Sequence, residues 1–156
     1  MHSPDSLTQV AEFHRTFHAP VLDTPQIPSE SRCGLRVALL AEELDEFREA
    51  IVAGDIVAVA DALCDLQYVL SGAVLEFGLG DKFKALFEEV QRSNMSKACL
   101  TVEEAEATVA QYQAKGVDCH YVESDGKFLV YRDADQKTLK SINYSPADLE
   151  TILNVD

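Results

Sequence analysis

Basic residues are scarce in this chain of 156 residues, which has 13 Lys and Arg against 27 Asp and Glu. The formal charge of −14 argues against a nucleic-acid binder, because such a protein needs a basic stripe that faces the phosphates. The acids do not mark a disordered tail either, since 47% of the residues are hydrophobic and can form the core of one ordinary domain.

Export signals and membrane segments are also missing from the sequence. No apolar stretch reaches the roughly 20 residues that span a bilayer, so we expect no contact with a membrane. Met1–Val10 has neither the basic nor the apolar segment of a signal peptide. The cysteines form no CxxC pair, which disfavours a zinc site and predicts free thiols in a reducing cytoplasm. They are Cys33, Cys64, Cys99 and Cys119.

The spacing of apolar residues, glycines and prolines predicts a mainly α protein. Three prolines between residues 19 and 31 exclude a helix there. Gly54 is expected to end one helix and Asp55 to cap the next, and residues 78–81 repeat this arrangement. Thr101 followed by Glu104 has the form of a capping box. Helices are therefore expected at residues 6–18, 32–53, 56–77, 82–96 and 101–115.

The C-terminal part is expected to add a small β-hairpin. Residues 128–131 form a β-prone run entered through residues 125–126, and we expect them to pair with residues 138–142 across a turn at 133–136. Pro146 is expected to open a last short helix. The predicted whole is one domain over residues 1–156, with a four-helix bundle core at about 6–98 and the helix and hairpin extension at about 100–156.

Acidic residues gather on two consecutive predicted helices. Glu46 lies four residues after Glu42 and three after Glu43, so the three glutamates share one arc of their helix, beside an apolar stripe. Asp61 and Asp65 share a face of the next helix in the same way. Because a tight turn joins the two helices, they should pack antiparallel and place the two groups of acids opposite each other.

The surroundings of these acids favour a metal site. The helix at 56–77 is apolar on nearly every side, so we expect it to be buried on most sides. Carboxylates on such a helix are costly unless they are paired, and no Lys or Arg lies between Arg48 and Lys82. Oxygen ligands without His or Cys suit Mg²⁺, with Mn²⁺ as a substitute. The competing interpretation is an ordinary solvated acidic surface.

The two motifs resemble those of the all-α nucleoside triphosphate pyrophosphatase superfamily. This group includes MazG-like proteins, dimeric dUTPases and phosphoribosyl-ATP pyrophosphohydrolases, and the chain is most similar to the last branch. The resemblance covers about residues 6–98 and rests on the EExxE of residues 42–46 and on Asp61 and Asp65. The family's second motif commonly reads ExxD, whereas this chain has DxxxD with Ala62 where that acid would fall.

The resemblance implies Mg²⁺-dependent hydrolysis of a nucleoside triphosphate to the monophosphate and pyrophosphate. Glu42, Glu43, Glu46 and Asp65 are then expected as metal ligands. Asp61 is expected either as a further ligand or as a group that orients one. One of the three glutamates would act as the general base, and their spacing does not select which. The base of the substrate stays open between guanine, a pyrimidine and a modified base.

Substrate-binding groups are expected outside the acids. Arg92, Asn94 and Lys97 lie at the end of the fourth predicted helix and suit phosphate or sugar, although Arg92 and Lys97 also complement the dipole of the helix C-terminus. Tyr68 lies one turn beyond Asp65, where it lines the pocket or packs in the core.

The first helix offers a further contact for the base. His14 lies off its apolar stripe, where it touches a base or faces solvent. Phe13 and Phe17 lie on that stripe, and we expect them to pack in the core.

Two alternatives to an enzyme remain. One is a metal-dependent nucleotide-binding module without turnover, and the other is a helical interaction protein whose acids form a surface patch. For the assembly we expect a homodimer or homotetramer, because an apolar helix at 56–77 needs more cover than its short neighbours provide.

Overall fold

The computed structural model describes residues 4–154, and the described chain divides after Phe83 into two compact units. The first three residues of Met1–Val10, where we expect no signal peptide, lie outside the described part. The boundary at residue 83 falls within the predicted core of residues 6–98. Assignment of the whole chain to one domain stays a prediction, and each unit is described below by itself.

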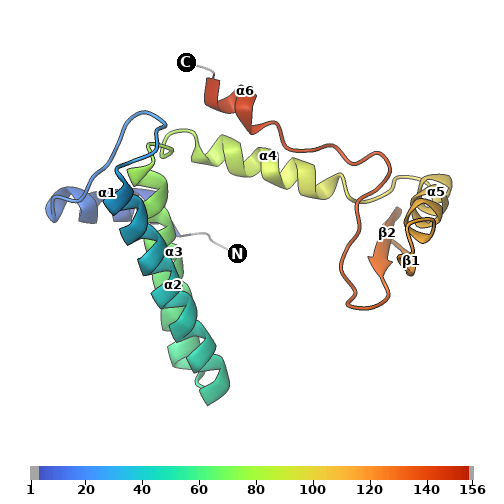
Figure 1. The fold of residues 1–156 in the computed structure, drawn as a ribbon, viewed down its shortest axis with the longest axis horizontal. Coiled ribbons are helices and arrows are strands. Elements are labelled where there is room, and N and C mark those ends of the chain that lie inside the picture. Colours follow the sequence, from blue (N-terminus) through green and yellow to red (C-terminus); the bar gives the residue numbers. More distant parts are fainter. Residues whose placement is uncertain (1–3, 155–156) are drawn as a thin grey trace. The chain divides into compact units, whose positions relative to one another are not determined.

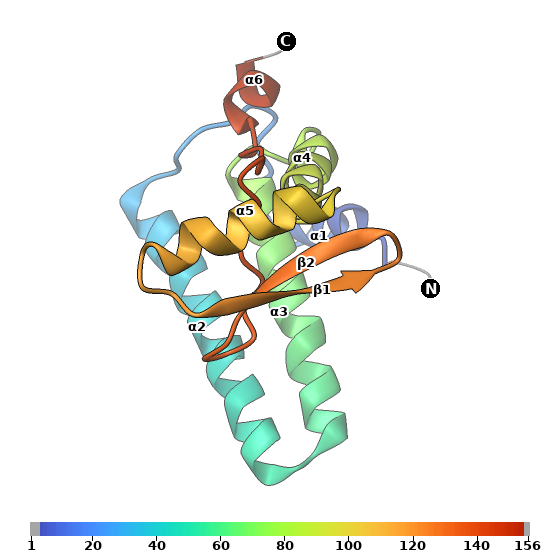
Figure 2. The ribbon, with the colours of Figure 1, turned by 90° about the vertical axis from the view of Figure 1, so that its right-hand side faces the viewer.

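The first unit contains α1 (Ser6–Thr16), α2 (Glu30–Ala53) and α3 (Ile56–Glu76). α2 and α3 lie side by side as an antiparallel hairpin, and α1 packs against α3 (Figure 1 and Figure 2). All three predicted helices are confirmed, with ends that differ by at most two residues. The hairpin positions the acidic residues of α2 and α3, so its construction decides the geometry of the site.

The turn between α2 and α3 has the predicted chemistry. Gly54 adopts the left-handed conformation with φ +68°, which ends α2 without the strain that a side chain would bring. The Asp55 side chain then accepts hydrogen bonds from the backbone N–H groups of Val57 and Ala58, at 2.9 and 3.1 Å. These bonds satisfy two of the free N–H groups at the start of α3 and fix where it begins.

A buried network of charged and polar side chains joins the three helices. Arg32 and Arg36 of α2 each donate through Nε to one oxygen of Glu76, which is fully buried at the end of α3. Arg36 also donates to Nε2 of His14 on α1, across 3.1 Å, and Nδ1 of His14 donates to the carbonyl of Pro20 at 2.7 Å. The network therefore ties α1, the following loop, α2 and α3 together at one end.

Close packing around this network explains Gly72 of α3. A Cβ atom there would lie 2.7 Å from Nη1 of Arg36 and 3.0 Å from Nε2 of His14. Glycine is thus the residue that lets both side chains reach across the face of α3. The proline-containing loop wraps the same end of the helix, where Leu22 and Gln26 donate backbone hydrogen bonds to the carbonyls of Leu75 and Phe77.

The apolar core of the first unit is small and differs from the prediction on α1. Val10 and Ala11 pack with Leu75. Phe13 and Phe17, expected in the core, are instead 42% and 65% exposed, and their rings lie against each other with centroids 4.4 Å apart. The prediction for these two rings was wrong because α1 turns the face of Val10, Ala11 and His14 toward α3.

α3 is also far less covered than its composition predicts. Ile56 and Val57 are each 75% exposed, and the buried residues of α3 lie mostly in its second half. The expectation of a helix buried on most sides was wrong within the described residues, because α1 and α2 cover it mainly along one side and leave most of its first half exposed. α3 is also long and apolar enough to cross a membrane by length and composition, contrary to our estimate of the apolar stretches.

The second unit contains most of α4 (Phe83–Met95), then α5 (Val102–Gln113), β1 (Cys119–Ser124), β2 (Lys127–Arg132) and α6 (Leu149–Asn154). α5 lies across the hairpin of β1 and β2, as Figure 2 shows. Thr101 accepts the N–H of Glu104 at 3.2 Å, as the capping box predicts. The reciprocal bond differs, since Glu104 accepts the N–H of Leu100.

The core of this unit forms between α5 and the hairpin. Its buried residues come from the segment before α5, from α5, from both strands and from the segment that follows them. They are Cys99, Ala105, Cys119, Val130 and Leu139.

The hairpin forms with a different partner from the one predicted. β2 pairs antiparallel with β1, and residues 125–126 are the turn between them. Residues 138–142 contribute only an isolated bridge from Thr138 to Tyr131. The strand at β1 was missed because its polar residues hide the alternation on which the strand prediction depends.

The last helix also starts later than predicted, at Leu149. Asp148 accepts the N–H of Thr151 at 3.1 Å, so Asp148 caps α6 and Pro146 lies before the helix. The predicted fold class is confirmed: the chain is mainly α, with a small antiparallel hairpin and a short terminal helix.

We predict that Glu76→Gln lowers the free energy of unfolding by about 3 kcal/mol, because it leaves two guanidinium groups without their buried counter-charge. Burial by itself would raise the pKa of Glu76, but the hydrogen bonds and charges of Arg32 and Arg36 outweigh burial and lower this pKa below 4.5. The stability that the carboxylate provides is thus present above pH 4.5 and is lost as the pH falls through the lowered pKa.

Urea unfolding of the wild type and the variant from pH 7 to pH 3 measures this difference. It should shrink on acidification. Glu12→Gln, on the exposed side of α1, is the matched control and should change stability little. Equal stability of wild type and Glu76→Gln at pH 7 would contradict the prediction.

Candidate active site

The antiparallel packing of α2 and α3 brings the predicted acids into one neighbourhood. Glu43 is partly buried, whereas Glu42, Glu46, Asp61 and Asp65 are exposed. The two groups lie at similar distances from the Gly54 turn on opposite helices, which is why they meet. The charges of Asp61 and Asp65 on α3 act on Glu43 of α2, so acids of the two groups lie near each other across the hairpin.

Glu43 experiences the other four carboxylates directly. Its pKa is raised above the ordinary value, first by burial and then by the charges of Asp65, Glu46, Glu42 and Asp61. Its Oε2 is buried and has no hydrogen-bond partner among the described residues. A buried carboxylate oxygen without a protein donor is costly.

Two of the acids line a cleft near the turn. The cleft has a volume of about 390 Å³ and lies between the end of α2 and the start of α3. Glu46 and Asp61 face it from opposite helices, and Glu49 and Asp55 add two more carboxylates. The remaining lining is alanine, so little besides carboxylate oxygen is offered to a ligand here. The cleft lining is Glu46, Glu49, Ala50, Ala53, Asp55, Ala58 and Asp61.

The carboxylates of this site have the chemistry of a metal site but not its geometry. Within residues 4–154, no three His, Cys, Asp or Glu side chains converge closely enough to hold an ion as they stand. The donor chemistry nevertheless fits, because all nearby donors are carboxylates and one oxygen, Oε2 of Glu43, lacks any partner. The side chains that would hold Mg²⁺ are Glu42, Glu43, Glu46, Asp61 and Asp65, of which four are exposed and therefore able to reorient.

Tyr68 lies one turn beyond Asp65, at the surface where α1 meets α3. It is 37% exposed, and its ring stands edge-on to that of Phe13 with centroids 5.6 Å apart. This position agrees in part with each of the two predictions for Tyr68, since part of the ring packs against Phe13 and the rest stays accessible to a ligand.

His14 occupies a different place from either one expected. It is only 3% exposed, and its two ring nitrogens form hydrogen bonds with Pro20 and Arg36. His14 therefore neither faces solvent nor presents a free nitrogen to a base. The prediction missed this because Arg36 and Gly72, which enclose it, come from other helices.

Arg92 is committed to contacts within the second unit. Its guanidinium bonds to Glu89, to Oγ of Ser145 at 2.9 Å and to the carbonyl of Pro146 at 2.9 Å. The Arg92 hydrogen bond and the backbone N–H of Asp148 lower the pKa of Glu89 to about 2. In this arrangement Arg92 holds the segment before α6 against α4.

Asn94 and Lys97 contact each other, with Nζ of Lys97 donating to Oδ1 of Asn94 at 2.8 Å. The structure adds two neighbours that the sequence did not suggest, Tyr144 and Lys140, whose ammonium lies 4.2 Å from the centre of the Tyr144 ring. A hydrogen bond with Ser93 and the charges of Lys140 and Lys97 lower the pKa of Tyr144. No local signal could have found this pair, because more than 40 residues separate it from Lys97.

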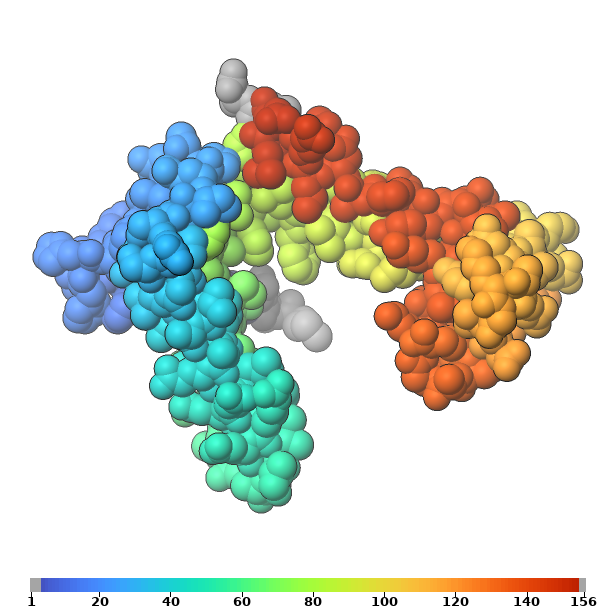
Figure 3. Space-filling view, in the orientation of Figure 1, coloured from blue at the N-terminus to red at the C-terminus, as the bar shows by residue number. Residues whose placement is uncertain are grey.

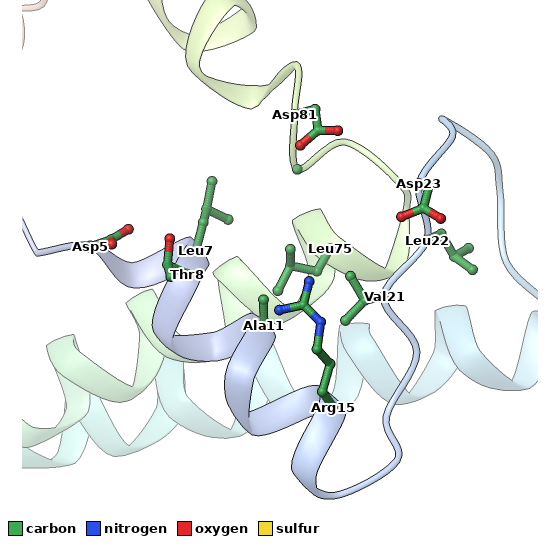
Figure 4. A pocket seen from close by; sticks show the side chains of 11 residues that line it. Asp5, Leu7, Thr8, Ala11, Arg15, Val21, Leu22, Asp23, Leu75 and Asp81 are labelled. Atoms are coloured by element: carbon green, nitrogen blue, oxygen red, sulfur yellow. The ribbon is translucent and has the colours of Figure 1, made fainter.

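A further cavity of about 440 Å³ lies on another side of α1 (Figure 4). Arg15 extends over a floor that includes Ala11 and Leu75, and Asp23 and Asp81 stand at its rim (Figure 4). None of the predicted site residues lines this cavity, so it is separate from the acidic site.

Comparison with known proteins identifies one family. The family model described as phosphoribosyl-ATP pyrophosphohydrolase matches residues 10–94, which is more than half of the chain. The match includes α2, α3 and all five acids of the site, while Lys97 lies beyond it. A comparison with curated proteins finds no match.

We predict that Glu43→Gln raises the Tm by about 1–2 °C without a divalent cation, because it removes several like-charge contacts worth a few tenths of a kcal/mol each. Mg²⁺ should reverse this order. At ten times its Kd it would stabilise the wild type by about 1.4 kcal/mol and the variant by less. Thermal unfolding with EDTA and with Mg²⁺ measures both effects.

Asp45→Asn is the matched control on the same helix. Asp45 pairs with Arg48 on an exposed surface, so its loss should lower the Tm slightly and leave the Mg²⁺ effect intact. A Tm of Glu43→Gln below that of the wild type in EDTA would show that Glu43 is stabilising where it stands.

Proposed function

The chain belongs to the phosphoribosyl-ATP pyrophosphohydrolase family, and from this premise we propose that it is a Mg²⁺-dependent nucleotide pyrophosphohydrolase. In this proposal it cleaves a (deoxy)nucleoside triphosphate to the monophosphate and pyrophosphate. Family membership indicates a hydrolase that acts on the acid anhydride of a nucleotide. The metal, the substrate and the residue roles below belong to the proposal.

One observation carries the proposal most directly. Within the matched region, the partly buried Glu43 has a partnerless oxygen and is surrounded by four other carboxylates that raise its pKa. Placing these acids together does not stabilise the fold, because their like charges repel each other. A cationic ligand accounts for both features, since it would pair the oxygen and offset the repulsion.

The protein side chains have three tasks in the reaction. Glu42, Glu43, Glu46 and Asp65 hold the cation, and Asp61 either joins them or orients one of them. When bound, Mg²⁺ neutralises charge on the phosphates and lowers the pKa of an attacking water. One of the three glutamates takes the proton from that water as it attacks phosphorus.

Separate groups serve the rest of the substrate. Lys97 supplies a point charge for phosphate, and Asn94 and Arg92 offer donors for phosphate or sugar. Lys97 and Asn94 are partners of each other in this structure, so binding requires that they exchange this bond for one to the substrate. Arg92 would have to give up Ser145 and Pro146 in the same way, which favours the other two as direct contacts.

The assembly we propose is a homodimer or homotetramer. Apolar side chains along α2 and α3 are exposed, and Figure 3 shows the surface of α2 uncovered by other segments of the first unit. A second copy would cover them and could complete the site. We also propose a cytoplasmic location, which agrees with four free thiols. The exposed apolar residues include Val37, Ile51, Val52, Ile56, Val57 and Leu70.

A panel of nucleotides with Mg²⁺, analysed by chromatography of the products, tests the function. It contains GTP, dGTP, dCTP, dUTP and, from the family's description, phosphoribosyl-ATP. Release of pyrophosphate from at least one compound supports the proposal. Binding without turnover would favour the nucleotide-binding module. Neither binding nor turnover would favour the helical interaction protein.

We predict that Glu46→Gln and Asp65→Asn each reduce kcat by more than about 100-fold, because each removes a proposed metal ligand. Both side chains are exposed, so the far-ultraviolet circular dichroism and Tm should change little. Asp45→Asn again serves as the control on α2. Wild-type kcat in Asp65→Asn would exclude Asp65 as a ligand.

We predict that the double variant Val52→Lys with Val57→Lys lowers the oligomeric state, because it would place charges in the proposed subunit interface. Sedimentation velocity compares it with Ile27→Lys, which changes an equally exposed apolar residue in the loop before α2. Only the double variant should dissociate. A monomeric wild type at micromolar concentration would contradict the proposed assembly.

A further inference from the structure

A second cavity in the first unit lies between α1 and α3, next to the acids. It has a volume of about 420 Å³ and is mostly apolar. Its polar groups come from two carboxamides, a serine hydroxyl and the phenol of Tyr68. The cavity lining is Pro4, Ser6, Gln9, Val10, Leu63, Cys64, Gln67 and Tyr68.

The two carboxamides differ in how they are used. Gln67 donates from Nε2 to Oγ of Ser71 at 3.1 Å and reaches Oγ of Ser6 at 3.4 Å, which holds its side chain in the wall of the cavity. Gln9 is exposed to solvent at the wall of the cavity, and its side chain has no hydrogen bond to a described residue. A carboxamide offers both donors and an acceptor, so Gln9 can bind one edge of a polar heterocycle.

The position of the cavity connects it to the acidic site. Asp61, Cys64, Asp65 and Tyr68 follow the spacing i, i+3, i+4 and i+7 and thus share one face of α3. Cys64 and Tyr68 line the cavity, while Asp61 and Asp65 act on Glu43. Six residues of helix separate Asp61 from Gln67, which is about 9 Å at 1.5 Å per residue.

We propose that this cavity binds the base of the nucleotide and that Gln9 is a specificity-determining residue, with Gln67 fixing the opposite wall. This inference rests on the proposed function, because the phosphates must lie at the acids for the base to reach the cavity. A nucleobase is flat, has apolar faces and carries donors and acceptors on its edges. The apolar walls, the edge of Tyr68 and the unpartnered carboxamide match these three properties in turn.

The alternative use of the cavity as part of a subunit interface makes a different prediction. An interface would be filled by apolar side chains and would leave Gln9 unpaired at a cost. A base would satisfy it. Replacement of Gln9 by leucine thus distinguishes the two, because it should weaken the binding of a base and leave or improve an apolar interface.

Cys64 provides a direct probe, because it is an exposed thiol in the cavity wall. The full-length protein is alkylated with iodoacetamide, and the rate at each cysteine is followed by peptide mass spectrometry. Adenosine, guanosine, cytidine and thymidine are added one at a time without metal. Cys33, which lies outside the cavity, is the internal control.

We expect at least one nucleoside to slow alkylation of Cys64 about fivefold or more in the wild type and in Gln26→Leu, but not in Gln9→Leu. Gln26 is the matched control because it lies in the loop before α2, away from the cavity. Calorimetric titration of the same nucleosides into the same proteins should show about a tenfold loss of affinity in Gln9→Leu. This measurement decides the matter if Cys64 is unreactive.

The inference fails if no nucleoside binds or if Gln9→Leu binds all of them as the wild type does. The proposed function fails separately. If a nucleotide is turned over but no nucleoside protects Cys64, the proposed hydrolase activity stands and this cavity is excluded as the base site. If a nucleoside protects Cys64 but no nucleotide is turned over, the base site stands and the proposed hydrolase activity is excluded.

Discussion

The buried carboxylate of Glu76 is the constraint on which the first unit depends. Two guanidinium groups from α2 converge on it, one of them also engages His14, and this clamp closes one end of the α2–α3 hairpin. The Gly54–Asp55 turn closes the other end. With both ends fixed, the register between the helices is determined, and Glu43 must lie near Asp65. The small apolar core could not specify that register alone, since few large side chains are buried between the helices.

The same unit treats two groups of carboxylates in opposite ways. Glu76 has Arg32 and Arg36 as counter-charges beside it, and its pKa is lowered despite complete burial. Glu43 is surrounded by acids, and its pKa is raised. Charge placed without compensation costs stability, so the contrast separates a structural carboxylate from the carboxylates for which we propose a ligand. In the function we propose, that arrangement has a chemical purpose, because a nucleoside triphosphate is a polyanion that acids can approach only through a cation.

Much of the local structure could be predicted from the sequence because it depends on neighbours along the chain. The caps at Asp55 and Thr101 involve bonds that span at most three residues, and the break at Gly54 depends on the left-handed backbone of that one glycine. The hairpin partner could not be predicted in the same way. Residues 138–142 lie on one side of β2 along the chain and β1 on the other, and the tight turn at residues 125–126 joins β2 to β1. The exposure of α3 was misjudged for a related reason, because composition shows that a face is apolar but not what covers it.

The sequence by itself determined the mainly helical class, the positions of α1, α2 and α3, and the five acids that face each other across one turn. Helical periodicity and a short connection suffice for these, since they are properties of adjacent residues. Only the tertiary structure decided that His14 is a buried partner of Arg36, that Arg92 braces the segment before α6, and that Gln9 faces a cavity beside Tyr68. Each of these depends on residues more than 20 positions apart, whose approach is fixed by packing and charge and leaves no pattern in the local sequence.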